Sequence, residues 1–128
     1  MAVYSYDHIH LRSPDPATAA KFYNKMFDAQ IIETPQPDGN TRVDLNLNGL
    51  TIFLAGAMPS GTEVQGVEGP HYGLDHFGLR VDNLDSAVSD LKAKGAELES
   101  EPRTLPTGVK IAFVKAPDDV RIELVERH

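Results

Sequence analysis

The sequence predicts an α+β fold made of two tandem β-α-β-β-β modules, each a half-open sheet with its helix outside. The first observation is a repeat: residues 7–12 and 75–80 lie 68 residues apart, and each places a histidine at the start of an alternating apolar and polar run. The second is that an amphipathic helical pattern follows each run. We expect one domain over 1–128, with modules at about 5–56 and 73–127 and a linker at about 57–72.

In the first module, Asp15 is the expected N-cap of a helix and Pro16 its first residue. An apolar face that includes Phe22, Tyr23 and Met26 carries this helix to about Phe27. The dipeptide at 48–49, Asn-Gly, favours a tight hairpin. Strands are expected at 7–12, 31–34, 41–47 and 50–55.

The second module repeats this plan. A helix is expected at 84–94, capped by the Asp-Asn pair at 82–83 and ended by Gly95. Strands are expected at 74–81, 96–100, 109–115 and 120–126. The Gly- and Pro-rich stretch at 56–73 is the connection between the modules, and its length suggests a role at a site, for example as a lid.

Composition restricts the classes of function. The chain of 128 residues has no cysteine, so a bound metal must be held by nitrogen and oxygen ligands. The net charge of −7 without basic clusters argues against nucleic acid. No apolar run approaches the roughly 18 residues that span a bilayer, and the N-terminus lacks the pattern of a signal peptide. We therefore expect a cytoplasmic protein that binds neither nucleic acid nor membrane.

Strand parity places three metal-ligand types on one kind of face. In their strands, the aliphatic neighbours point one way, toward a helix, and His8, His76 and Glu123 point the other way. A single strand histidine is more often a hydrogen-bonded structural residue. Here the duplicated position and the carboxylate favour a divalent metal, because two imidazoles and a carboxylate are common ligands and leave coordination positions open for catalysis.

Motifs at 8–12 with 20–23, at 76–83 and at 112–124 resemble the vicinal oxygen chelate superfamily, which includes glyoxalase I, extradiol dioxygenases, methylmalonyl-CoA epimerase, fosfomycin-resistance transferases and bleomycin-resistance proteins. The resemblance covers nearly the whole chain and implies a fold of the glyoxalase type. By similarity, His8, His76 and Glu123 fall on the metal ligands of the family. It also implies a small organic substrate and a homodimer with the site at its interface. The metal would be Fe, Mn, Zn, Ni or Co.

Two departures from the family pattern keep the reaction open. Phe53 stands where glyoxalase I and the epimerases carry a fourth ligand, and Phe113 stands where extradiol dioxygenases carry a tyrosine. The first hypothesis is a glyoxalase-like lyase or isomerase that chelates vicinal oxygens of its substrate. The second is an Fe(II)-dependent dioxygenase. The third is a metal-free binding protein of the bleomycin-resistance kind.

Other side chains are candidates for catalysis or substrate binding. By parity His10 faces the same way as His8, as a wall, a substrate contact or a general base, because an imidazole exchanges protons near neutral pH. Asp44 is the nearest candidate for the acid-base group that Phe53 cannot supply. Arg12 and Arg80 occupy matching positions and either bind an anionic substrate or form ion pairs at the rim. The expected substrate pocket is lined by Arg12, Phe53, Arg80 and Phe113.

Overall fold

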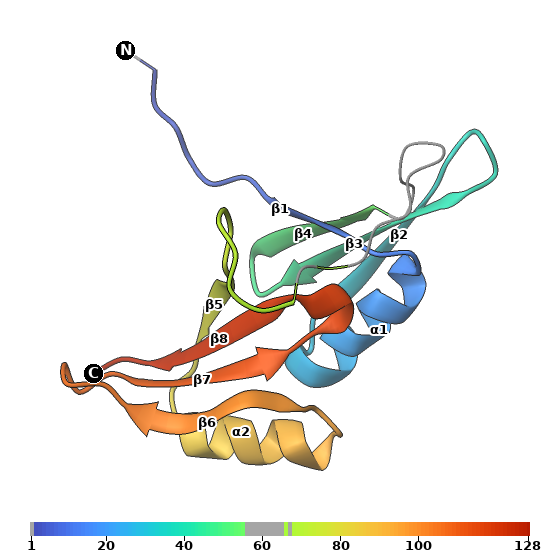
Figure 1. The fold of residues 1–128 in the computed structure, drawn as a ribbon. Coiled ribbons are helices and arrows are strands. Elements are labelled where there is room, and N and C mark those ends of the chain that lie inside the picture. The colour runs from blue at the N-terminus through green and yellow to red at the C-terminus, as the bar shows by residue number, and fades with distance from the viewer. Residues whose placement is uncertain (1, 56–65, 67) are drawn as a thin grey trace. The chain divides into compact units, whose positions relative to one another are not determined.

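The computed structural model describes residues 2–55, 66 and 68–128. The chain divides into two compact units, Met1–Glu63 and Val64–His128. The elements run β1-α1-β2-β3-β4 in the first unit and β5-α2-β6-β7-β8 in the second, which confirms the α+β fold and the duplicated β-α-β-β-β plan (Figure 1).

The first unit is an open four-stranded sheet covered on one face by a helix. Its elements are β1 (Ile9–Arg12), α1 (Pro16–Phe27), β2 (Gln30–Pro35), β3 (Thr41–Leu47) and β4 (Leu50–Ala55). The strand order is β1-β4-β3-β2. The edge strand β1 pairs with β4 in parallel, and the other pairs are antiparallel. At the predicted hairpin, Asn48 (φ 50°) and Gly49 (φ 94°) both have positive φ, as a type I′ turn requires.

Helix α1 begins and ends where the sequence predicts. The Asp15 side chain accepts a hydrogen bond from the Thr18 backbone N–H (Oδ1–N 3.1 Å), and Pro16 is the first helical residue. One face of α1 buries Tyr23 and packs mainly against β3, where Leu45 is fully buried. The first unit thus has its own core between helix and sheet.

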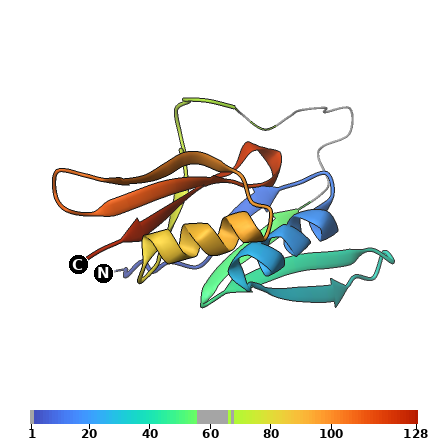
Figure 2. The same ribbon diagram turned by 90° about the horizontal axis from the view of Figure 1, so that it is seen from below.

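The second unit repeats this architecture. Its elements are β5 (Phe77–Arg80), α2 (Leu84–Ala93), β6 (Leu98–Thr104), β7 (Lys110–Lys115), the short 3₁₀ turn η1 (Pro117–Asp119) and β8 (Arg121–Glu126). The strand order is β5-β8-β7-β6, with β5 parallel to β8. Figure 2 shows α2 running along the sheet of its own unit, and it contacts β7, β6 and β8. The predicted helix stop at Gly95 has a φ of 94°.

The start of α2 is held by a buried carboxylate. Asn83 accepts a hydrogen bond from the Ser86 N–H (2.9 Å), as an N-cap does. In addition, Glu126 at the end of β8 accepts a hydrogen bond from the Leu84 N–H (2.8 Å), and the Glu126 residue is only 8% exposed. This contact ties the first backbone amide of the helix to the last strand.

Strands β1 and β5 are shorter than predicted. The parallel ladders begin at Ile9 opposite Ile52 and at Phe77 opposite Ile122, so His8 and His76 each lie just before a strand. The alternating pattern continues further toward the N-terminus than the backbone pairing does, and for this reason the predicted starts at 7 and 74 are wrong. Strand β6 starts later than predicted and continues to Thr104. Most of the predicted linker, residues 56–65 and 67, lies outside the described residues.

Candidate functional site

On one face of the first sheet, three of the candidate site residues lie side by side on neighbouring strands. In the strand register, Phe53 lies between His10 on β1 and Asp44 on β3. The neighbouring positions Ile52 and Leu54 are buried on the opposite face. Parity therefore places the candidate groups of this unit on the face that α1 does not cover.

Phe53 is the packing centre of this face. The His8 ring stacks on it with a centroid distance of 4.1 Å, and the His10 ring meets its edge at 6.3 Å. The Arg42 guanidinium lies 4.6 Å from the Phe53 centroid. Since β1 and β3 flank β4, His8 approaches the ring from the residue just before β1, and Arg42 approaches it from β3. The His8 Nδ1 atom also lies 2.6 Å from Oδ2 of Asp7.

In the described part of the chain, the Asp44 carboxylate has one oxygen without a hydrogen-bond partner. Its Oδ2 accepts a hydrogen bond from Arg42 Nε (2.8 Å), and its side chain is 15% exposed. Its Oδ1 is buried and has no hydrogen-bond partner among residues 2–55, 66 and 68–128. Such a carboxylate oxygen can accept a proton, or a hydrogen bond from a substrate hydroxyl.

In the second unit, a histidine faces a carboxylate. His76 Nε2 lies 3.8 Å from Oε2 of Glu123, and His76 Nδ1 lies 2.7 Å from Oδ2 of Asp75. The hydrogen bond from His76 is the main cause that lowers the pKa of Asp75 below its usual value, so the carboxylate is ionised and can only accept. A neutral His76 ring would therefore donate from Nδ1 to Asp75 and keep a lone pair on Nε2. This orientation fits a metal ligand.

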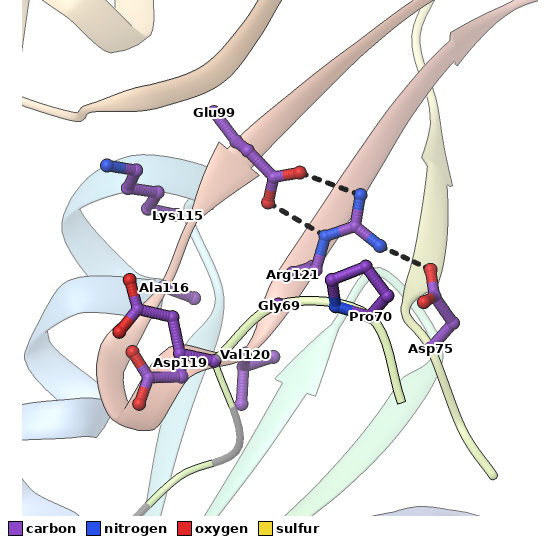
Figure 3. Close-up of a pocket in the computed structure, with 10 residues that line it drawn as sticks. Gly69, Pro70, Asp75, Glu99, Lys115, Ala116, Asp119, Val120 and Arg121 are labelled. Carbon is purple, nitrogen blue, oxygen red and sulfur yellow. Dashed lines mark hydrogen bonds and ion pairs between the residues drawn. The ribbon is translucent and has the colours of Figure 1, made fainter. Parts of the chain in front are cut away.

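Arg121 holds three side chains of this unit together. Its guanidinium donates two hydrogen bonds to Glu99, from Nε (2.7 Å) and from Nη2 (2.8 Å), and a third from Nη1 to Asp75 (Figure 3). It also lies 4.4 Å from the centroid of the Phe113 ring. The hydrogen bond from Arg121 lowers the pKa of Glu99. The group connects β6, β7 and β8 to the residue that precedes His76.

A pocket of about 510 Å³ adjoins Arg121 in the second unit, and Figure 3 shows its lining residues. Six of its lining residues are charged: Glu68, Asp75, Glu99, Lys115, Asp119 and Arg121. The uncharged lining residues are Gly69, Pro70, Ala116 and Val120. The predicted lining residues Arg12, Phe53, Arg80 and Phe113 are not among those that line this pocket.

The loop beside the pocket is held by a histidine. His71 Nδ1 lies 2.9 Å from the Gly69 carbonyl oxygen, and its Nε2 lies 2.9 Å from that of Leu74. Carbonyl oxygens only accept hydrogen bonds, so both contacts are satisfied together only by the doubly protonated ring. The hydrogen bond to Gly69 and then that to Leu74 raise the pKa of His71.

The structure brings together part of the predicted metal set. His76 and Glu123 lie on one face, whereas His8 belongs to the other unit, so the three-ligand set stays a prediction. Within the part of the chain that the structure describes, no group of three or more His, Cys, Asp or Glu side chains is arranged to hold a metal ion.

The predicted pocket residues differ in their surroundings. Arg12 and Arg80 are exposed at the ends of β1 and β5. Phe113 is 8% exposed and packs with Ile111 and Val125, and its edge meets the His76 ring at a centroid distance of 5.0 Å. It is therefore an apolar wall behind the histidine.

Sequence reasoning missed the carboxylates beside the two histidines and the arginine that holds one of them. The signal for the first was present, because Asp precedes His at both 7–8 and 75–76. The signal for Arg121 was its parity, since it shares a strand face with Glu123. Its hydrogen-bond partners Glu99 and Asp75 lie 22 and 46 residues away in the chain, and no local pattern predicts them.

Comparison with known proteins gives concordant results. Residues 5–124 match the model of the Glyoxalase/Bleomycin resistance protein/Dioxygenase superfamily. The chain is 33% identical to the uncharacterized protein YwkD of Bacillus subtilis (strain 168), over 99% of this chain and 100% of that protein. It is 30% identical to mitochondrial methylmalonyl-CoA epimerase of Homo sapiens, over 94% of this chain and 70% of the epimerase.

The fold also matches solved structures. The crystal structure of SMU.1112c superposes with a TM-score of 0.77 at 26% identity, over 98% of this chain and 100% of that one. None of the helices in the described residues is long and apolar enough to cross a membrane.

Proposed function

The chain belongs to the glyoxalase/bleomycin resistance protein/dioxygenase superfamily, and from this premise we propose that it is a metal-dependent enzyme of the lyase or isomerase kind. The proposed ligands of a divalent ion are His8, His76 and Glu123. The observation that carries the proposal is the approach of His76 Nε2 to Glu123 Oε2 at 3.8 Å, with the other ring nitrogen engaged by Asp75. A neutral imidazole and a carboxylate are suitable donors for first-row divalent ions.

The chemistry that such an ion supplies is Lewis-acid polarisation of two adjacent oxygens on a small organic substrate. The chain itself supplies orientation and proton transfer. Asp75 keeps the proton on Nδ1 of His76, so that Nε2 stays a donor of electrons. The Oδ1 atom of Asp44, which has no hydrogen-bond partner in the described residues, is the proposed proton acceptor, and His10 lies in the same register row.

Metal content tests the proposal directly. Elemental analysis of protein purified without chelators should give about one divalent ion per chain for the wild type and a clear loss for Glu123→Ala. Glu101→Ala is the matched control, because Glu101 is an exposed glutamate of the same unit that pairs only with Lys92 in the described residues. If Glu123→Ala keeps the full metal content, Glu123 is not a ligand.

An Fe(II)-dependent dioxygenase is the second candidate. The observation that favours it is Phe53, whose ring packs between His8 and Arg42 at the position of a fourth ligand and leaves a set of three. Oxygen consumption by the iron-loaded protein would support this reading, and anaerobic turnover with Ni, Co, Mn or Zn would support the first. A wild type with no stoichiometric metal would instead indicate a metal-free binding protein.

We also propose a cytoplasmic homodimer in which one chain supplies His8 and its partner supplies the other two ligands. Complementation tests this pairing. When His8→Ala and Glu123→Ala chains are co-expressed, an exchanged arrangement restores one intact site per mixed dimer, whereas pairing within a chain restores none. Metal content of the isolated mixed dimer is the measurement.

A further inference from the structure

The orientation of His76 is set by side chains rather than by its strand. The ladder of β5 with β8 begins one residue later, at Phe77. What holds the ring is the contact from Nδ1 to Asp75 and the edge contact with Phe113. Yet the Asp75 side chain is 45% exposed, and an exposed aspartate by itself exchanges between rotamers and water.

We propose that Arg121 is a positioning residue that fixes the Asp75 carboxylate and thereby holds the His76 ring with its proton on Nδ1 and its lone pair toward Glu123. The inference deepens the proposed function, since it takes His76 as a metal ligand. It assigns to Arg121 a role through Asp75 and not a contact with substrate or metal.

Three contacts in series support this role: His76 to Asp75, Asp75 to Arg121, and Arg121 to Glu99. We call this series the relay. Asp75 Oδ2 lies within hydrogen-bond distance of both Arg121 Nη1 and His76 Nδ1, so a single oxygen bridges the guanidinium and the imidazole. Arg121 itself has little freedom, because its other nitrogens form a two-point fork with Glu99 and its plane packs on Phe113. The strands that hold Arg121 therefore also restrict the orientation of the His76 ring, through Asp75.

The first unit provides an internal comparison. The ladders start at Ile52 in β4 and at Ile122 in β8, so the position that corresponds to Arg121 is Thr51. A threonine cannot form a guanidinium fork. There Asp7 contacts His8 in the same way, but its side chain is 85% exposed. The relay is therefore a property of the second unit, where the histidine faces a carboxylate.

Removal of Arg121 distinguishes a positioning role from a purely electrostatic one, because the two predict opposite changes in the affinity for a divalent metal ion. Arg121→Met removes a positive charge and leaves Glu99 unneutralised, which by Coulomb attraction should strengthen the binding of a divalent cation. If Arg121 acts by positioning, affinity should instead fall, by about tenfold to a hundredfold, as for other groups that orient metal ligands.

The first measurement uses the metal-free protein. Nitrogen-15 spectra of the imidazoles, recorded at a pH where His76 is neutral, report which ring nitrogen carries the proton. The wild type and the control Lys92→Met should show the Nδ1–H form alone, since Lys92 pairs with Glu101 away from the relay. Arg121→Met should show a mixture of both tautomers. A single Nδ1–H form in Arg121→Met would overturn the inference.

The second measurement is the dissociation constant for Zn²⁺ or Co²⁺ by calorimetry. The double variant Arg121→Met with Glu99→Gln restores the local charge and avoids a partnerless carboxylate, which protects against failure to fold. It should bind as weakly as the single variant. Tighter binding in either variant would refute positioning. A wild type that binds no metal would count against the proposed function, and the tautomer result would still decide the role of Arg121.

Discussion

The buried contact between Glu126 and helix α2 gives the sharpest test of what stabilises the second unit. Glu126→Ala leaves the first backbone N–H of α2, that of Leu84, without the acceptor that lies 2.8 Å away in the wild type. A hydrogen bond to a charged group contributes about 1.5–3 kcal/mol, and a negative charge at a helix N-terminus adds about 0.5 kcal/mol. We expect the free energy of unfolding to fall by about 2–3 kcal/mol.

Two further variants divide this loss into its parts. Glu126→Gln keeps an acceptor oxygen and loses the charge, so it should cost about 1 kcal/mol. His128→Ala is the control. It removes a contact of 3.4 Å to Glu126, made by a side chain that is 67% exposed, and it should change stability by less than about 0.5 kcal/mol.

Urea denaturation followed by circular dichroism at 222 nm measures these differences. Hydrogen exchange supplies a local readout, in which the Leu84 amide should exchange faster in Glu126→Ala than in the wild type. The reasoning would be refuted if Glu126→Ala were as stable as the wild type, or if Leu84 exchanged no faster in the variant.

Three other outcomes follow from single residues. The pKa of His71 is raised, so its two loop contacts stabilise the fold fully below about pH 6.5 and are lost as the pH rises through the folded-state pKa. An NMR titration of the ring should therefore have its midpoint above the ordinary pKa of histidine. A midpoint at or below that value would contradict the double contact. Leu45→Ala removes a fully buried side chain beneath α1 and should cost about 3 kcal/mol in thermal or urea unfolding. Gly49→Ala forces a side chain into a φ of 94° and should cost about 1 kcal/mol or more, whereas an unchanged stability would show that the turn relaxes.

Local patterns predicted the elements well because local physics forms them. The start of α1 follows from Asp15 and Pro16, and the hairpin at 48–49 follows from residues that tolerate positive φ. The late starts of β1 and β5 could not be predicted in this way. They depend on where a partner strand distant in the sequence begins to pair.

The candidate site was predictable only in part for a similar reason. Parity placed Glu123 on one strand face, and the structure puts His76 beside it. The fork between Arg121 and Glu99 joins strands through long side chains, and such contacts depend on reach and packing rather than on spacing. The two contacts of His71 depend likewise on the path of a loop, for which the sequence holds no periodic signal.

Each sheet has an acidic and an aromatic residue opposite each other on its two middle strands, and the positions of the two are reversed between the sheets. In the first, Phe53 lies on β4 and Asp44 opposite it on β3, whereas in the second Glu123 lies on β8 and Phe113 opposite it on β7. A duplicated ancestor could reach either arrangement through a few substitutions while its backbone stayed the same. Each half therefore serves as a reference for the other. Placing the acid–aromatic pair of one sheet into the other would show whether the second backbone still accepts the reversed arrangement.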